Sequence, residues 1–212
     1  MKKTAIILAG GTSHRLGQDK GLMPLGSKPL IMHILDRVCP SVDERIVVIN
    51  SAAQMESYTK ILGSDVQLVV LRNRVQMPLA GALAGFEKST GEYSLLLPCD
   101  APFISEEVIK ILFELCVGKS AAIPRWPNGN LEPLQAVYRT SNACVAAKEA
   151  LLSGHTDVRS MISNLKGVRY ISTLVIQQLD PPLYTFLNVN TPQDFKKAES
   201  LLKRLVSSQP LN

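Results

Sequence analysis

Two glycines and two cations with the chemistry of a phosphate site follow the first apolar run of the chain. Residues 5–9 are apolar without alternation, which predicts a strand buried on both faces. Gly10 and Gly11 come next, and paired glycines let successive backbone N–H groups converge on an anion. Arg15 can hold phosphate through its planar fork, and Lys20 can follow phosphate oxygens as a mobile point charge. The pattern predicts a phosphate-binding loop at the end of a buried strand.

The spacing in this loop differs from the two commonest phosphate-binding motifs. The Walker pattern needs a Lys followed by Ser or Thr, whereas Lys20 is followed by Gly21. The dinucleotide fingerprint G-x-G-x-x-G is also absent. Residues 8–20 match the longer pattern L-A-G-G-x-S-x-R-[LM]-G-x-D-K instead. A match of that length disfavours the structural alternative, which is a glycine-rich turn whose charges face solvent.

The longer pattern resembles the signature of nucleotidyltransferases, which move a nucleoside monophosphate onto a phosphorylated acceptor. Its continuation through Gly21 and Leu22 is most similar to the molybdenum cofactor guanylyltransferases. The resemblance covers nearly the whole chain and implies GTP as the donor and the phosphate of molybdopterin as the acceptor. Pyrophosphate and molybdopterin guanine dinucleotide would be the products. It also implies transient contact with proteins that load molybdate or insert the finished cofactor.

A single carboxylate, Asp100, follows the apolar strand expected from residue 93 onward. Mg²⁺ takes one or two protein carboxylates and completes its shell with waters and phosphate oxygens. The string at residues 98–102, Pro-Cys-Asp-Ala-Pro, resembles the metal-binding motif of the family. The structural alternative is that Asp100 caps the next helix, but Ser105 supplies that cap more naturally. We therefore expect Asp100 to bind Mg²⁺.

The expected nucleotide side of the site combines Asn50 with a segment of small residues. Asn50 ends the strand expected at residues 45–50, where ligands of open α/β sheets gather, so it can reach the ribose or the base. An Asn that simply turns the chain is an equal alternative. Residues 78–81, Pro-Leu-Ala-Gly, leave space for a flat base at a helix start, and by resemblance this is where the family holds guanine.

Two positions depart from the family pattern on this nucleotide side. Met77 stands in place of the first glycine of the guanine-binding string, and Arg72 stands about where the family carries an aspartate. A carboxylate can accept from the N1–H and amino groups of guanine, whereas Arg can only donate. The two departures leave the base that the enzyme selects open.

By resemblance, the acceptor side of the site comes from the last third of the chain. Residues 131–138 correspond to a family string that lines the acceptor side of the cleft, and within them Gln135 and Tyr138 match. Asn188 and Asn190 fall on one side of an extended segment, and one of them could bind the metal or the acceptor phosphate. Trp126 could stack on a pterin, although packing against its own hairpin is the commoner outcome for a loop Trp.

These patterns yield three sets of candidate site residues. The catalytic set is Arg15, Lys20 and Asp100, with Asp100 also the metal ligand. The nucleotide-binding set is Leu8, Ala9, Gly10, Gly11, Thr12, Ser13, Lys20, Asn50, Pro78, Leu79, Gly81 and Asp100. The acceptor-binding set is Gln135, Tyr138, Asn188 and Asn190.

The chemistry that these residues suit is attack by an acceptor phosphate on the α-phosphorus of a nucleoside triphosphate. The acceptor is already anionic, so alignment and charge neutralisation suffice without a nucleophilic side chain. One alternative is an enzyme of the same fold with another base or acceptor, such as a cobinamide-phosphate guanylyltransferase or a sugar-1-phosphate nucleotidyltransferase. The other is a non-catalytic nucleotide-binding regulator, which could dispense with the metal carboxylate.

The elements that must position these residues indicate one α/β domain. We expect a Rossmann-like three-layer sandwich, with a mostly parallel central sheet and helices on both faces. Strands are expected at residues 5–9, 45–50, 66–71, 93–100, 121–124, 134–139 and 186–189. Helices are expected at residues 29–38, 52–62, 105–117, 141–153 and 156–165, and also beginning near 78 and at 192. The domain is expected to span residues 1–206, followed by a flexible tail at 207–212.

Composition narrows the protein class further. At 212 residues with 46% hydrophobic and 19% charged residues, the chain has the make-up of a globular protein. No apolar run reaches the length of a membrane span. The net charge of +5 is spread among acidic residues without interleaved aromatics, which disfavours nucleic acid as a partner. Four scattered cysteines without a C-x-x-C motif indicate reduced thiols and a cytoplasmic location.

Overall fold

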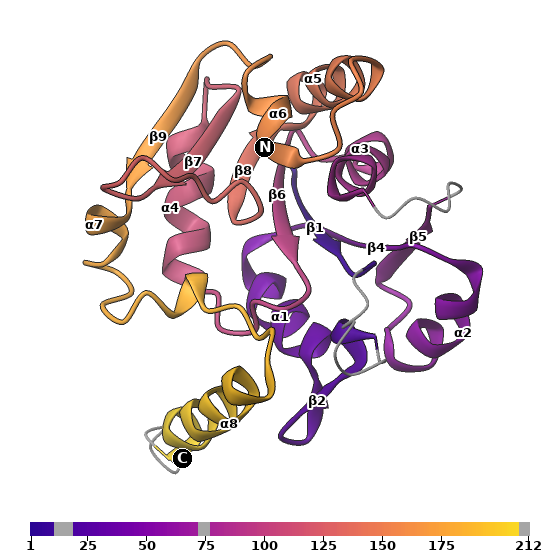
Figure 1. Cartoon of the computed structure of the whole chain (residues 1–212), viewed down its shortest axis with the longest axis vertical. Helices are drawn as coiled ribbons and strands as arrows, with labels where there is room; N and C mark the ends of the chain where they lie inside the picture. Colours follow the sequence, from indigo (N-terminus) through magenta and orange to yellow (C-terminus); the bar gives the residue numbers. More distant parts are fainter. Residues whose placement is uncertain (11–18, 72–76, 208–212) are drawn as a thin grey trace.

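The chain folds around one twisted sheet, which Figure 1 shows in the computed structural model. The structure describes residues 1–10, 19–71 and 77–207. Within these residues the strand order of the sheet is β5-β4-β1-β6-β8-β7-β9. The strands are β1 (Lys3–Leu8), β4 (Glu44–Ile49), β5 (Val66–Val70), β6 (Tyr93–Pro98), β7 (Ala121–Arg125), β8 (Ala136–Arg139) and β9 (Val168–Ser172). Only β8 runs antiparallel to its described neighbours, which confirms the mostly parallel sheet.

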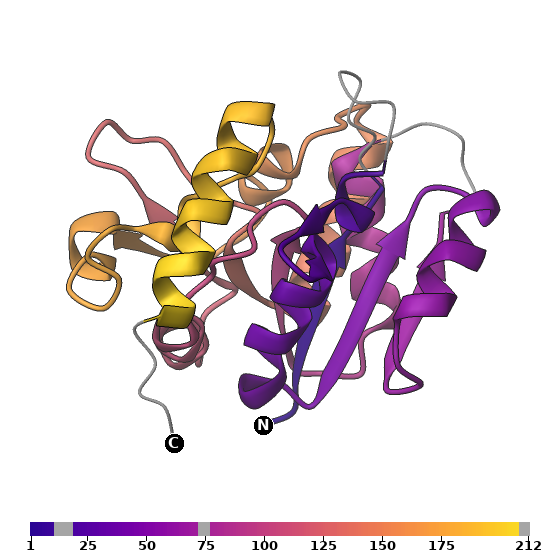
Figure 2. The same ribbon diagram turned by 90° about the horizontal axis from the view of Figure 1, so that it is seen from below.

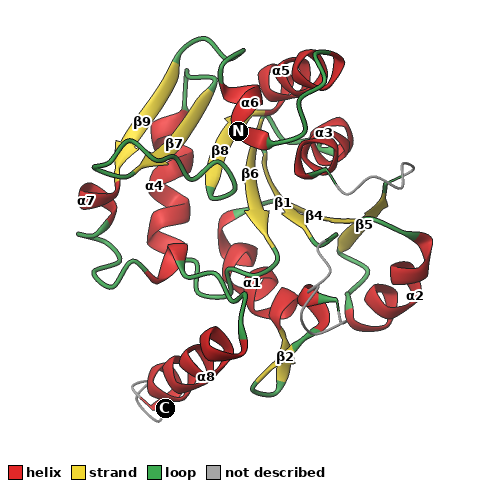
Figure 3. Ribbon diagram, viewed as in Figure 1, coloured by secondary structure: helices red, strands yellow, loops and turns green. Residues whose placement is uncertain are grey.

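Helices cover both faces of this sheet, as Figure 3 shows by colour. The α-helices are α1 (Leu30–Val38), α2 (Ala52–Ile61), α3 (Pro78–Lys88), α4 (Glu106–Cys116), α5 (Thr140–Leu152), α6 (Val158–Ile162), α7 (Thr173–Ile176) and α8 (Pro192–Ser207). The short elements are the hairpin strands β2 (Pro24–Leu25) and β3 (Lys28–Pro29) and the 3₁₀ turns η1 (Lys20–Leu22), η2 (Cys39–Ser41) and η3 (Tyr184–Phe186). The three-layer sandwich is confirmed.

Alternate residues of β1 enter different hydrophobic clusters, so the strand is buried on both faces. Ile7 packs in the cluster that contains α1 and α4, and Ile6 packs in the cluster that contains α3 and α5. A Cβ atom on Gly85 would lie 2.3 Å from Cγ2 of Ile6, so the glycine lets α3 approach the sheet closely. This contact fixes how closely α3 packs on the middle of β1.

The last helix, α8, packs outside this sandwich, as Figure 2 shows. Ala198 and Leu201 join a third hydrophobic cluster with Leu25 of β2 and Leu30 of α1. At its start, Thr191 accepts a hydrogen bond from the backbone N–H of Asp194 at 3.2 Å, which confirms Thr191 as the capping residue. The helix continues through Ser207, one residue into the expected tail, and residues 208–212 lie outside the described chain.

The carboxy-terminal third corrects several expectations from the sequence. The strand expected at residues 186–189 is absent; η3 stands there, followed by irregular backbone. The backbone of this segment is hydrogen-bonded to other loops. The N–H of Thr185 donates to Asp180 Oδ2 at 2.7 Å, and the N–H of Val189 donates to the carbonyl of Asp100 at 2.8 Å. The helix expected at 156–165 shrinks to the short α6, and β9 and α7 had no sequence prediction.

Candidate functional site

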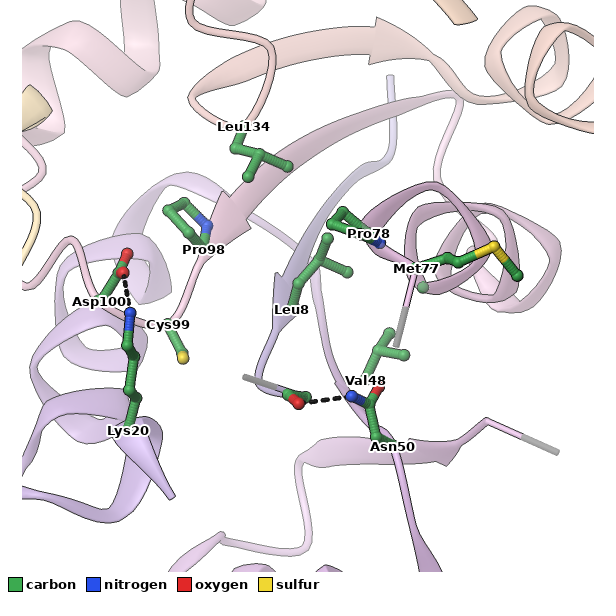
Figure 4. A pocket seen from close by; sticks show the side chains of 12 residues that line it. Leu8, Lys20, Val48, Asn50, Met77, Pro78, Pro98, Cys99, Asp100 and Leu134 are labelled. Carbon is green, nitrogen blue, oxygen red and sulfur yellow. Dashed lines mark hydrogen bonds and ion pairs between the residues drawn. The ribbon is translucent and has the colours of Figure 1, made fainter. Parts of the chain in front are cut away.

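The candidate site is a cavity of about 290 Å³ at the carboxyl ends of β1, β4 and β6 (Figure 4). Ligands of open α/β sheets bind at this edge. The cavity is lined by Leu8, Gly10, Lys20, Val48, Asn50, Met77, Pro78, Gly81, Pro98, Cys99, Asp100 and Leu134. Seven of these were predicted to bind nucleotide: Leu8, Gly10, Lys20, Asn50, Pro78, Gly81 and Asp100. Figure 4 shows Lys20 and Asp100 on one side of the cavity, with Met77 and Pro78 across from them.

Among the described residues that line this cavity, Lys20 carries the positive charge, and it contacts two described partners from distant parts of the chain. Its Nζ atom lies 3.3 Å from Oδ2 of Asp100, which follows β6. It also donates a hydrogen bond to Oδ1 of Asn190, immediately before α8. Lys20 itself is the first residue of η1. Three elements far apart in the sequence therefore meet at one ammonium group, as the motif analysis predicts for Lys20 and Asp100.

Asp100 is a largely buried carboxylate, with its side chain 14% exposed. Burial raises the pKa of this carboxyl above its ordinary value, and the positive charge of Lys20 opposes the rise. Oδ2 faces Lys20, whereas Oδ1 is buried without a hydrogen-bond partner in the described structure. A buried carboxylate oxygen with spare acceptor capacity fits the single hard ligand that the sequence predicts for Mg²⁺.

Other protein ligands for a metal are scarce around Asp100. Across the described residues, no group of three His, Cys, Asp or Glu side chains stands close enough together to hold a metal ion. Mg²⁺ usually keeps several waters and binds through one or two carboxylates plus substrate phosphates. The residues present fit that mode of binding, with Asp100 as the carboxylate and Asn190 as a nearby neutral oxygen.

Gly10 and Asn50 form the floor of the cavity between β1 and β4. The Asn50 side chain donates a hydrogen bond from Nδ2 to the carbonyl of Gly10. A Cβ atom on Gly10 would lie 2.1 Å from Asn50 Oδ1, so the absence of a side chain at Gly10 lets the two segments meet. Asn50 thus fixes the chain just beyond β1 and lines the cavity, and its contact with the ribose or the base stays a prediction.

The acceptor side of the site is only partly assembled from the predicted residues. Asn188 is exposed, and its Oδ1 accepts a hydrogen bond at 3.3 Å from Nε2 of Gln135, which is 1% exposed. Tyr138 is fully buried, its ring contacts Phe86, and its hydroxyl donates to the carbonyl of Pro133 at 2.8 Å. In the described structure Tyr138 is therefore a core residue, and its predicted contact with the acceptor stays a prediction.

Two predicted nucleotide-binding residues also lie outside the cavity wall. Ala9 is fully buried, and its N–H donates to the carbonyl of Val48 at 2.8 Å. Leu79, in the first turn of α3, is fully buried, and its N–H donates to the carbonyl of Thr156 at 3.2 Å. Their apolar side chains pack in the core and their backbone donors are occupied, and their predicted contacts with the nucleotide stay predictions.

Several predictions fall on parts of the chain that the structure does not describe. Gly11, Thr12, Ser13 and Arg15 all lie in residues 11–18, and Arg72 lies in residues 72–76. Their predicted roles in binding phosphate and base stay predictions.

Five lining residues stand outside the predicted sets, although Met77 was noted at the start of the guanine-binding string: Val48, Met77, Pro98, Cys99 and Leu134. Val48 and Pro98 stand at the carboxyl ends of β4 and β6, and that position was a usable signal. Trp126 donates to Glu132 Oε1 at 2.6 Å and packs edge-on against Phe186 at 5.5 Å. The side chain of Trp126 is thus bonded within its own hairpin through Glu132, while its ring packs against Phe186 of η3, a contact that the sequence did not predict.

This chain is similar in sequence and in structure to known proteins. A protein called molybdenum cofactor guanylyltransferase from Desulfosudis oleivorans is 32% identical and is aligned over 94% of this chain and 96% of its own length. A probable molybdenum cofactor guanylyltransferase from Methanosarcina acetivorans is 31% identical over 99% of this chain and 94% of its own length. The crystal structure of molybdopterin-guanine dinucleotide biosynthesis protein A from Archaeoglobus fulgidus superposes with a TM-score of 0.80 at 26% identity, covering 95% of this chain and 99% of that one.

The family model described as "MobA-like NTP transferase domain" matches residues 5–168. This segment includes β1, η1, α3, β6 and β8, and with them Lys20 and Asp100. Because the match covers most of the chain and includes both charged groups of the cavity, the protein belongs to the family of MobA-like NTP transferase domains.

Proposed function

We propose that this chain is a molybdenum cofactor guanylyltransferase, which transfers GMP from GTP to the phosphate of molybdopterin and releases pyrophosphate. The observation that carries the proposal is the contact between Lys20 and Asp100 at 3.3 Å, in a cavity at the carboxyl ends of the parallel strands. A cation and a carboxylate at this edge suit phosphoryl chemistry, and the names of the relatives support guanylyl transfer onto molybdopterin.

The residues of the site would act by alignment and charge neutralisation. The phosphate of the acceptor is anionic at neutral pH and can attack the α-phosphorus directly, so no side chain has to become a nucleophile. Lys20 would neutralise charge on the α-phosphate, where its mobile ammonium can follow the oxygens through the reaction. Arg15 and the backbone of residues 10–13 would hold the β- and γ-phosphates and stabilise departing pyrophosphate.

Asp100 would hold Mg²⁺ through its unpaired Oδ1 atom. The ion would supply Lewis-acid neutralisation of phosphate charge when bound. Asn190 would contribute a neutral oxygen beside Lys20, and Asn188 with Gln135 would line the path of the acceptor. Of these residues Asp100 lines the cavity, and Asn190 is connected to the cavity through its hydrogen bond with Lys20.

The base of the donor would lie against the start of α3. Pro78 and Gly81 line the cavity there, and Met77 and Val48 add apolar surface. Asn50 Oδ1 can accept from the nucleoside because Nδ2 is the atom that donates to Gly10. These features suit a flat base, and GTP is favoured by the names of the relatives.

The scattered cysteines support a cytoplasmic location for this reaction. In the part of the chain that the structure covers, every helix is too short or too polar to cross a membrane. Transient contact with proteins that deliver or receive the cofactor completes the proposal.

The proposed activity is tested by pyrophosphate release. The purified chain with Mg²⁺ is given GTP, ATP, CTP or UTP, each with and without molybdopterin or its molybdate-loaded form. We expect release only when GTP and the pterin are both present, and loss of release in Lys20→Ala and Asp100→Ala. Lys28→Ala is the matched control, because the Lys28–Asp36 pair lies on the exposed surface. Release with another nucleotide, or only with cobinamide phosphate or a sugar phosphate, would contradict the proposal.

A further inference from the structure

The carboxylate next to Lys20 in the chain is held by groups that reach it from α2. Asp19 is the N-cap of η1, and its Oδ1 accepts from the N–H of Gly21 at 3.0 Å. The same oxygen accepts from the hydroxyl of Tyr58 at 2.8 Å. Oδ2 accepts from Nε2 of Gln54. Both oxygens of Asp19 are thus engaged by donors, two of which come from α2.

Gln54 has a fixed orientation because both ends of its amide are used. Its Oε1 accepts from the N–H of Asn50 at 2.9 Å and from that of Ser51 at 3.2 Å. This forms the capping box of α2 and leaves Nε2 directed at Asp19. One side chain therefore connects the end of β4, where Asn50 lines the cavity, to the residue before Lys20.

Tyr58 lies one helical turn after Gln54 and reaches the same carboxylate. Residues four apart share a face of a helix, so both side chains leave α2 in the same direction. The Tyr58 side chain is fully buried, and burial raises the pKa of its hydroxyl far above the ordinary value, so that the group stays a donor. A Cβ atom on Gly21 would lie 2.2 Å from the Tyr58 hydroxyl, so Gly21 provides the space for this contact.

These contacts bear on which partner Lys20 takes. A free carboxylate on the adjacent residue would compete for the ammonium group of Lys20. Because donors from α2 and Gly21 already occupy Asp19, Lys20 instead contacts Asp100 and Asn190 across the cavity. The hydrogen bond to Gly21 also fixes the backbone of the turn from which the lysine side chain starts.

We propose that Gln54 and Tyr58 are positioning residues, which hold Asp19 and thereby direct Lys20 into the cavity. Neither residue lines the cavity, so they act through Lys20 rather than on the substrate. The inference rests on the proposed function to the extent that Lys20 binds the phosphates of GTP.

The test is a double-mutant cycle on the affinity for GTP, measured by isothermal titration calorimetry with Mg²⁺. Tyr58→Phe removes the hydroxyl and keeps the ring that fills the core. We expect it to weaken GTP binding about tenfold, as the loss of one hydrogen bond to a charged group would. In the Lys20→Ala background the same change should weaken binding less than about twofold, because its effect passes through Lys20.

The matched control is Tyr93→Phe, on β6. Tyr93 is also buried, and its hydroxyl accepts one hydrogen bond, from the N–H of Gly118 at 3.1 Å. Tyr93 lies at the amino end of the sheet, so loss of its hydroxyl should leave the affinity for GTP unchanged. A merely structural Tyr58 would weaken GTP binding equally in both backgrounds, and that result would overturn the inference.

A second variant keeps the inference testable if Tyr58→Phe folds poorly. Gln54→Glu retains oxygen acceptors for Asn50 and Ser51 but loses the donor to Asp19. It should weaken GTP binding at pH 8 in the wild-type background and much less in Lys20→Ala. GTP binding that equals wild type in both variants would refute the positioning role. If GTP binds but no transfer to molybdopterin occurs, the proposed function fails while the cycle still decides the inference.

Discussion

Replacing Lys20 by Met should leave the carboxylate of Asp100 buried without its cation. The Nζ atom of Lys20 lies 3.3 Å from Asp100 Oδ2, and the two side chains are 21% and 14% exposed. Oδ1 of Asp100 has no hydrogen-bond partner among the described residues, so the substitution removes the partner of the other oxygen as well. Met keeps the length and the apolar stem of Lys, so packing changes little. The perturbation is therefore mainly electrostatic.

The expected loss of folding stability follows from the distance between the two charges and from their burial. At the 3.3 Å separation, an effective dielectric constant of about 20 gives a gross attraction of about 5 kcal/mol. Part of this lost attraction is offset, because folding of the variant no longer desolvates an ammonium group. Removing one partner of a buried ion pair typically costs about 3–5 kcal/mol of stability. Since both side chains keep some exposure, we expect a loss of about 2 kcal/mol at pH 8. For a protein of this size, that lowers the Tm by about 4–8 °C.

The pH dependence has a definite sign. Burial raises the pKa of Asp100 in the folded state, and Lys20 opposes the rise, so Lys20→Met raises this folded-state pKa further. A carboxyl whose pKa is raised by folding favours the fold most below its unfolded pKa, about 3.9, and this benefit is lost as pH rises through the folded value. The stability deficit of the variant is therefore full above its own raised pKa. The deficit shrinks as pH falls below the folded-state pKa of Asp100 in the variant, and it disappears below the folded-state pKa of Asp100 in the wild-type protein.

The assay is thermal unfolding followed by circular dichroism, at a series of pH values and without divalent metal. Lys28→Met is the matched control, because the Lys28–Asp36 pair is about half exposed on both sides and should contribute less than about 1 kcal/mol. The double variant Lys20→Met with Asp100→Asn should recover most of the lost Tm, since the unpaired charge is gone. An unchanged Tm at pH 8, or a deficit that persists unaltered into acid, would refute the electrostatic reasoning.

Three further substitutions test the site and its support. Gly10→Ala places a Cβ atom 2.1 Å from Asn50 Oδ1 and should raise the KM for GTP about tenfold in the pyrophosphate assay; an unchanged KM would contradict the role of this floor. Gly85→Ala forces a Cβ atom against Ile6, where overpacking of about 1–3 kcal/mol exceeds the helix-propensity gain of about 1 kcal/mol, so urea denaturation should show a net loss of stability rather than a gain. Tyr138→Phe should cost about 1 kcal/mol of stability and leave the KM for molybdopterin unchanged, whereas a raised KM would restore its role at the acceptor.

The parts of the site that sequence reasoning located best follow directly from buried strands. Asn50 and Asp100 come just after apolar runs, and Lys20 ends the loop that follows the first such run. The carboxyl ends of parallel strands meet at one edge of the sheet. The local pattern therefore places them together without knowledge of the rest of the fold. Their convergence on one cavity is the outcome of that topology.

The features that the sequence did not predict depend on contacts that no local pattern encodes. Tyr138 lies within β8, between β6 and β7, so its ring points into the core beside Phe86 instead of reaching the edge of the sheet. The segment before α8 has the composition of a strand, but its backbone is held by Asp180 and by the carbonyl of Asp100. Both outcomes depend on tertiary neighbours, which override local propensity.

The partners of Lys20 explain how the cavity can receive a polyanion. The ammonium group is shared between one carboxylate, 80 residues away, and one neutral amide, 170 residues away. A second carboxylate in place of Asn190 would make the cluster net negative and repel a triphosphate. Asp19, the nearest carboxylate in sequence, is kept from Lys20 by the donors on α2. Among the described residues of this cluster, one cation balances one carboxylate. Lys20 can therefore exchange its neutral partner for a phosphate oxygen at small electrostatic cost.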